Sequence, residues 1–116
     1  MRLVKAYVRT HMANEVVTAL EKLNIHRVML VHVEEIGEGI FKKETHLETS
    51  VGCQYTEMIK IELVCPNEEL DHVKQAIIST AKTGYKGDGL IAVSKLEEAI
   101  SIRTGEMIAK DNMEDV

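Results

Sequence analysis

The chain has 116 residues, of which 45% are hydrophobic and 28% charged, and this length fits one domain with its own core rather than two domains or a small cross-linked scaffold. The formal net charge of −5 repels the phosphate backbone of nucleic acids, and the few aromatic side chains offer no platform for stacking bases. No apolar run is longer than residues 28–31, so we expect no membrane span, no signal segment and a cytoplasmic protein.

The first half of the chain predicts two strands and a helix. Apolar and polar residues alternate over residues 3–9, as in a strand with one buried face. From Ala13 onward apolar residues recur every three or four positions, which predicts an amphipathic helix that Asn24 stops. Residues 28–33 are apolar and rich in valine and predict a second strand, and the aperiodic stretch that follows predicts a long loop over residues 36–56.

The second half begins with the same design. Residues 58–65 alternate as residues 3–9 do and predict a third strand, which Pro66 ends. Asn67 is a candidate N-cap for a second helix that runs to about Lys82.

The C-terminal part is predicted from shorter signals. Residues 90–93 are apolar throughout and predict a strand with both faces covered. We expect one helical turn at 95–99, an extended piece at 100–103 and a flexible acidic tail at 107–116, which leaves a domain over residues 1–106.

Two strand–helix–strand units give the βαββαβ order of the ferredoxin-like α+β sandwich. Two helices then cover one face of the sheet. The other face is mixed in character and too apolar in places for water, so we expect it to meet further copies of the chain in a homo-oligomer. Its predicted members are Lys5, Tyr7, Lys60, Glu62 and Val64.

A glycine-rich turn over residues 83–89 is the densest signal for a binding site. Glycines at 84, 87 and 89 allow a backbone nest that suits a phosphate or carboxylate, and Lys86 adds positive charge. Glycine-rich connections are also common for conformational reasons alone, and Arg103 considered by itself is equally typical of an exposed surface residue. The spacing leaves both interpretations open.

The pattern Thr-Gly-x-x-Gly-Asp-Gly at 83–89, followed by Ile-Arg-Thr-Gly-Glu at 102–106, resembles the C-terminal half of the PII signal-transduction proteins, and the resemblance extends over residues 1–106. It implies a homotrimer that binds an adenine nucleotide (ADP, AMP or ATP) between subunits. It also implies a regulator of nitrogen, carbon and energy metabolism rather than an enzyme. The long loop at 36–56 would dock onto a target protein, such as a membrane transporter or a regulated enzyme.

The resemblance also implies which residues bind the nucleotide. Arg103 would reach the phosphates from the adjacent subunit, and Lys86 is a cation close to the phosphate-binding turn. Met58, Leu90 and Ser101 stand where the family usually has basic residues, so each removes a positive partner for phosphate. The implied nucleotide-binding residues are Gly37, Glu62, Val64, Lys86, Gly87, Asp88, Gly89 and Arg103.

The loop departs from the family pattern as well. Gly39 stands where a glutamine usually ligates magnesium and helps to hold 2-oxoglutarate, which leaves a role for Mg²⁺ open. Val51 occupies the position of the tyrosine that is uridylylated in some members. Both 2-oxoglutarate sensing and uridylylation therefore lack their usual residues.

The sequence leaves two other functions open. His32, His46 and Cys53 supply donors for a transition metal but show no metal-binding spacing, and PII-like proteins associated with heavy-metal efflux also have altered loops. The alternative function is therefore a sensor of a metal ion or another small ligand with a weakened nucleotide site. Catalysis by Glu62 or Asp88 beside Lys60 is less well supported, because a Lys-x-Glu pair on a strand is typical of a salt bridge.

Overall fold

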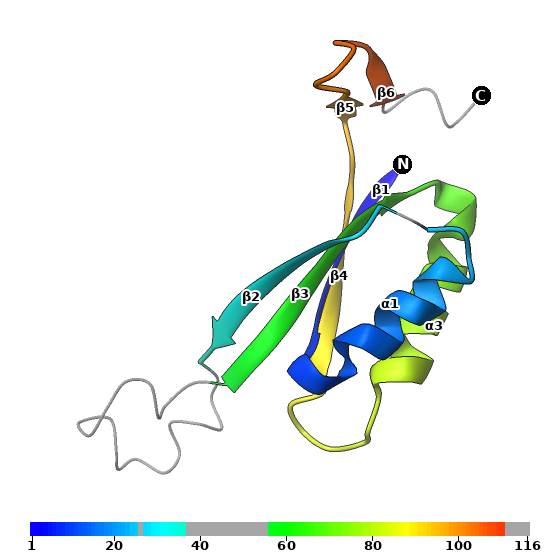
Figure 1. Ribbon diagram of the computed structural model, residues 1–116. Coiled ribbons are helices and arrows are strands. Elements are labelled where there is room, and N and C mark those ends of the chain that lie inside the picture. Colours follow the sequence, from blue (N-terminus) through cyan, green and yellow to red (C-terminus); the bar gives the residue numbers. More distant parts are fainter. Residues whose placement is uncertain (26, 37–55, 111–116) are drawn as a thin grey trace.

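Four antiparallel strands form the main sheet of the protein in a computed structural model, which describes residues 1–25, 27–36 and 56–110. Two helices pack on one face of this sheet (Figure 1). The order of elements along the chain is βαββαβ, which confirms the ferredoxin-like α+β fold. The elements are β1 (Arg2–Arg9), α1 (Ala13–Glu21), β2 (Met29–Glu35), β3 (Thr56–Cys65), α3 (Leu70–Ala81) and β4 (Gly89–Lys95), and the strand order in the sheet is β2-β3-β1-β4.

Alternation in the two central strands builds the core. Every second residue of β1 and β3 faces the helices and is buried against apolar residues of α1 and α3. This core is aliphatic, as the composition requires. Its largest fully buried members on the helix side include Val4, Val8, Val16, Leu20, Ile61, Leu63, Val73 and Ile77.

One of the two predicted helix ends is confirmed by the structure, and the other is wrong. Asn24 follows α1 with a left-handed φ of 65°, and the Ile25 N–H donates to the Leu20 carbonyl at 3.1 Å, which confirms Asn24 as the stop. The prediction for Asn67 is wrong. A short 3₁₀ turn (Asn67–Glu69) precedes α3, and no side chain caps the first turn of either helix.

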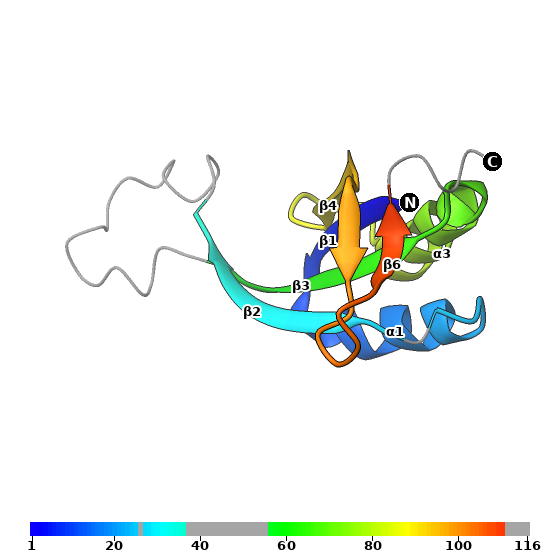
Figure 2. The same ribbon diagram turned by 90° about the horizontal axis from the view of Figure 1, so that it is seen from above.

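The segment 98–110 forms a β-hairpin instead of the predicted helical turn, the extended piece and, over residues 107–110, the flexible tail. Strand β5 (Glu98–Ile100) pairs with β6 (Met107–Lys110), and the two lie side by side as a separate two-stranded sheet (Figure 2). Residues 102–104 form a turn between them. Pairing across this turn sets the structure, and the local sequence pattern does not show such pairing.

The long loop falls almost entirely outside the described residues. Strand β2 reaches Glu35, two residues beyond its predicted end, and β3 begins at Thr56. Residues 37–55 and 111–116 lie outside the part of the chain that the structure describes. No helix among the described residues is long and apolar enough to cross a lipid bilayer.

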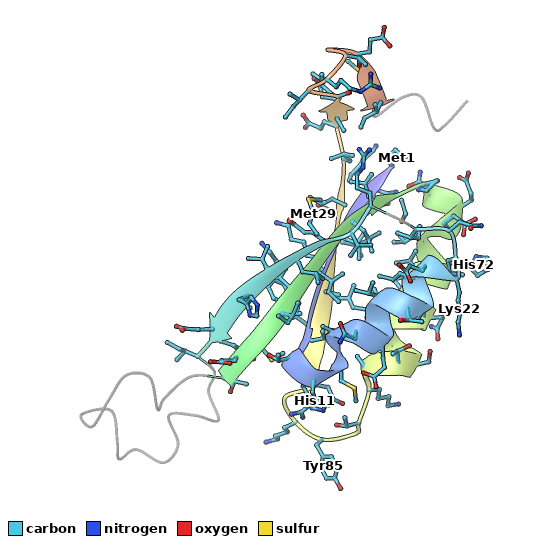
Figure 3. The ribbon with its side chains drawn as sticks, in the orientation of Figure 1. Met1, His11, Lys22, Met29, His72 and Tyr85 are labelled. Carbon is cyan, nitrogen blue, oxygen red and sulfur yellow. The ribbon has the colours of Figure 1, made fainter. Side chains whose placement is uncertain are left out.

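Among the described residues, no helix packs on the face of the sheet that lies away from α1 and α3. Strand register places Met29 and Val31 on this face beside Glu62 and Lys60, and Figure 3 shows Met29 on the side away from the helices. The side chain of Leu90 is 54% exposed and that of Val93 is 40% exposed, so one chain alone does not cover the two faces of the last strand. We call the side that bears Leu3, Lys5, Tyr7, Arg9, Met29, Val31, Val33, Met58, Lys60, Glu62, Val64, Leu90 and Ala92 the open face.

Candidate functional site

The glycine-rich turn between α3 and β4 is held closed by one carboxylate. Asp88 Oδ2 accepts the backbone N–H groups of Thr83 at 2.8 Å and Gly84 at 2.9 Å, and Asp88 Oδ1 accepts the Thr83 hydroxyl. The Tyr85 N–H then donates to Thr83 Oγ1 at 3.1 Å. Asp88 is therefore turned into its own loop and shapes the turn.

Arg9, at the end of β1, braces the same turn from the sheet. Its Nε donates to Asp88 Oδ1 at 3.2 Å, and its Nη2 donates to the Lys86 carbonyl at 2.9 Å. Arg9 is not among the residues that the sequence predicts for the site, because its partners lie 77 and 79 positions later in the chain. A basic residue that ends a strand next to a predicted glycine-rich turn is the one local signal that points to this contact.

These contacts keep Asp88 ionised. Hydrogen bonds from the Thr83 hydroxyl and the Thr83 backbone N–H lower the pKa of the Asp88 carboxyl below its usual range, with smaller contributions from Gly84 and Arg9. The carboxylate and the Arg9 guanidinium thus remain a charged pair at neutral pH. Asp88 itself cannot hold a phosphate, since both groups are negative.

The glycines of the turn are required by geometry. Gly89 has a φ of +113°, and a Cβ at this position would lie 1.7 Å from the Tyr7 carbonyl oxygen. Gly87 has a φ of +96° and packs on Arg9, whose Nη2 would lie 3.3 Å from a Cβ there. No other residue type fits at position 89 without a shift of the backbone.

The outer side of the turn offers unused donors. Within the described residues, no oxygen accepts a hydrogen bond from the amide N–H of Lys86 or of Gly87. The Lys86 side chain is exposed beside them. Two free amide donors next to an ammonium group form a local setting that attracts an anion.

Met58 and Leu90 are the apolar side chains beside the turn on the open face, where the register also places Arg9 and Lys60. Met58 is only 1% exposed, and its Cε would lie 3.4 Å from a Cβ on Gly89. Register places Leu90 opposite Tyr7 and Met58 opposite Arg9, so these side chains line the open face next to the turn. Met58 thus occupies the space beside Gly89 with an uncharged group.

Two hollows flank the turn. One of about 290 Å³ lies between α3 and β4, with Ile77, Ile78 and Leu90 among its apolar lining and Lys82 at its border. The other lies at the opposite side of the turn, where His11 and Tyr85 share its wall at the same end of the molecule (Figure 3).

The other predicted nucleotide-binding residues lie away from this turn. Val64 pairs with Leu3, whereas Gly89 pairs with Val8, so five residues of β1 separate the two positions, or about 17 Å. Glu62 lies between them and forms an ion pair with Lys5 at 3.9 Å. Gly37 lies outside the described residues.

Arg103 is farther still from the turn. It lies in the exposed turn of the β5–β6 hairpin, and Figure 1 shows this hairpin beyond the opposite end of β4. Strand β4 has 7 residues and alone spans about 20 Å. One chain therefore brings Lys86, Gly87, Asp88 and Gly89 together, but it does not bring Arg103 or Val64 to them.

Comparison with known proteins identifies the family. The family model described as nitrogen regulatory protein P-II matches residues 1–106. The chain belongs to the P-II family. It is 36% identical over 110 residues to the nitrogen regulatory protein P-II of Rhodobacter capsulatus, a match that covers 91% of this chain and 95% of that protein. It is 34% identical over 110 residues to that of Haemophilus influenzae, with 91% and 95% covered, and 33% identical over 107 residues to that of Porphyra purpurea, with 92% and 96% covered.

The proteins of the P-II family are nitrogen regulatory signalling proteins, and they are regulators rather than enzymes. Glu62, a candidate for catalysis beside Lys60, forms an ion pair with Lys5 on the neighbouring strand of this P-II chain. Glu62 therefore serves as the cross-strand salt bridge that such a sequence pattern favours.

Metal candidates of this P-II chain are not brought together among the described residues. His32 is exposed on β2, and no group of three or more His, Cys, Asp or Glu side chains in residues 1–25, 27–36 and 56–110 is placed to hold a metal ion. His46 and Cys53 lie outside the described residues. Cys65 is a buried free thiol whose pKa is raised by burial.

Proposed function

We propose that this P-II chain is a cytoplasmic homotrimeric regulator that binds an adenine nucleotide (ADP, AMP or ATP) between subunits and controls a partner transporter or enzyme through its loop at 36–56. The observation that carries the proposal is the separation of the glycine-rich turn from Arg103. Each part has features of half an anion site, and neither part is complete in one chain.

The distance between the two halves favours a site between copies. The turn offers free amide donors and Lys86 at one end of β4, and Arg103 offers a guanidinium beyond the other end. The hairpin that carries Arg103 has few contacts with the four-stranded sheet of its own chain. An adjoining copy can bring a guanidinium to the turn, as closed symmetric oligomers commonly do.

The open face supports the oligomer. It exposes Met29, Val31 and Leu90, each at 41% to 54%, along one side of the sheet. Aliphatic surface of this kind gains about 25 cal/mol for each Å² removed from water. Covering this face with other copies of the chain would also place Val64 and Glu62 at the contact between subunits.

The register links the turn to the base of the long loop. Met58, which borders Gly89, pairs with Val33 on β2, and Thr56 pairs with Glu35 just before the loop begins. A ligand at the turn can therefore shift the ends of β2 and β3 that carry the loop. A nucleotide that binds the two loop arrangements with different affinity would couple its own binding to that of a partner.

The proposal predicts that millimolar AMP, ADP or ATP raises the melting temperature by several degrees, because a ligand that binds only the folded protein stabilises it. Arg103→Ala should abolish the rise, and Lys22→Ala, which removes an exposed cation at the end of α1, should leave it unchanged. Differential scanning fluorimetry measures both effects. If none of the three nucleotides changes the melting temperature, the proposal fails.

A further inference from the structure

We propose that Arg9 and Thr10 are positioning residues that couple the glycine-rich turn to the first residues of β3, from which the loop at 36–56 departs. Arg9 is the last residue of β1, and Thr10 begins the short 3₁₀ turn (Thr10–Met12) that follows it. The inference rests on the proposed function and adds how a ligand at the turn would act on the base of the loop.

The end of β1 lies between the turn and the start of β3. In the sheet, β1 has β3 on one side and β4 on the other, and both neighbours are antiparallel to it. The register pairs Arg9 with Met58 near the start of β3, and it pairs Val8 with Gly89 at the start of β4. The residues that end β1 therefore contact the turn on one side and the base of the loop on the other.

Arg9 bonds to the turn, and Thr10 bonds to β3. The Arg9 guanidinium donates to Asp88 Oδ1 at 3.2 Å and to the Lys86 carbonyl at 2.9 Å. The Thr10 hydroxyl donates to the Glu57 carbonyl at 3.2 Å. Glu57 is the second residue of β3, next to the base of the loop. Two adjacent residues of the chain thus hold the turn and the base of the loop.

One peptide group joins the proposed ligand contact to Arg9. The Lys86 carbonyl that accepts from Arg9 belongs to the same peptide group as the free N–H of Gly87. This peptide is trans, so its N–H and its carbonyl point in opposite directions, and the Gly87 N–H is directed away from Arg9. An anion bound to this N–H would strengthen the hydrogen bond from Arg9, because hydrogen bonds in a chain polarise one another.

Thr10 extends this chain of contacts to β3. A shift of Arg9 moves the next residue with it, and so it moves the Thr10 hydroxyl relative to the Glu57 carbonyl. Two arrangements of the loop base that differ in this hydrogen bond would differ in nucleotide affinity, which is a coupling between two sites. One neutral hydrogen bond accounts for a change of about fivefold in such an equilibrium.

Limited proteolysis of the full chain tests the role of Thr10. Trypsin is added with and without saturating AMP, ADP or ATP, and mass spectrometry follows the fragments that end at Lys42 or Lys43. We expect the nucleotide to change the rate of this cleavage about fivefold in wild-type protein and less than about twofold in Thr10→Val, which keeps the side-chain shape but lacks the donor. Calorimetry should show that the nucleotide affinity of Thr10→Val changes by no more than the same factor, because coupling is reciprocal.

Two variants control for the loss of a hydroxyl group. Thr10→Ser retains the donor and should respond to nucleotide as wild-type protein does. Thr80→Val removes a hydroxyl whose hydrogen bond, to the Ala76 carbonyl at 2.7 Å, lies within α3, and it should leave the response unchanged. Thr10 is exposed, so its replacement does not disturb the core.

Arg9→Met tests the other half of the link. Loss of the guanidinium releases Asp88 and the Lys86 carbonyl, so we expect weaker nucleotide binding and, at saturating nucleotide, no response of the cleavage rate. Thr10→Val added to Arg9→Met should lower the response no further, because residues that act in series are not additive.

The outcomes separate this inference from the function on which it rests. If Thr10→Val responds as wild-type protein does, or if either control variant loses the response, the link through Thr10 is overturned and nucleotide binding stands. The same holds if a nucleotide binds wild-type protein without changing the cleavage rate. If no adenine nucleotide binds, both proposals fail.

Discussion

Asp88 gives the turn its shape, because four donors from three residues surround one carboxylate. The carboxylate is neutralised by Arg9 and satisfied by Thr83 and Gly84, so an acidic residue stands within a turn that can still attract an anion. We propose that the free amide groups of Lys86 and Gly87 make the binding surface. Asp88 and Arg9 are thus positioning residues, and we expect Lys86 and the glycine backbone to touch the ligand.

Gly89 provides the sharpest residue-scale prediction. Gly89→Ala should lower the free energy of unfolding by at least about 2 kcal/mol more than Gly84→Ala, because its Cβ would overlap the Tyr7 carbonyl. Gly84 also has a positive φ, of +94°, but nothing lies within 4 Å of a Cβ there, so its replacement should cost only about 1 to 2 kcal/mol of backbone strain. Urea denaturation measures both variants, and equal losses would contradict the close approach at Gly89.

At the scale of elements, the sequence predicted those strands and helices whose pattern is local. Alternation in residues 3–9 and 58–65 identified β1 and β3, because one face of each is buried under the helices. The β5–β6 hairpin was missed because Glu98 pairs with Lys110 across twelve positions and the intervening residues show no strand pattern. Asn67 failed as a cap because the chain enters α3 through a 3₁₀ turn.

The sequence predicts the glycine-rich turn of the candidate site, but it does not predict that the Arg9 side chain supports this turn. Three glycines and Asp88 form a local pattern that indicates a binding turn. The bracing by Arg9 depends on sheet topology that joins β1 to β4, and the sequence around residue 9 offers only a basic residue at the end of a predicted strand. The distance between Arg103 and the turn likewise follows only from the three-dimensional structure.

Strand β6 lies after residues 1–106, which are the residues that the family model matches, and its removal can be predicted separately. Deletion of residues 107–116 should change the free energy of unfolding of the four-stranded core by less than about 1 kcal/mol, since the hairpin packs mainly on itself. The same deletion should weaken AMP binding at least tenfold, because β5 without a partner strand cannot hold Arg103 in place. Denaturation and calorimetry on the shortened chain measure the two effects, and unchanged AMP affinity would show that β6 has no role in the site.

At the scale of the whole molecule, we propose that a turn from one copy and an arginine from another complete each nucleotide site. A symmetric trimer of such chains has its open faces covered and holds equivalent sites between neighbouring subunits. Each chain then contributes one half to each of two sites. Loss of either half should remove binding in an oligomer made of one variant.

Subunit mixing tests this claim most directly. Arg103→Ala and Gly87→Val chains should each fail to bind AMP alone, because one lacks the guanidinium and the other has a distorted turn where φ is +96°. When the two are co-expressed with different tags and purified as mixed oligomers, the intact turn of the first can meet the intact Arg103 of the second. We predict that calorimetry on the mixed oligomers shows restored AMP binding at fewer than one site per chain. Mixed oligomers that bind no AMP, although wild-type protein does, would contradict the account.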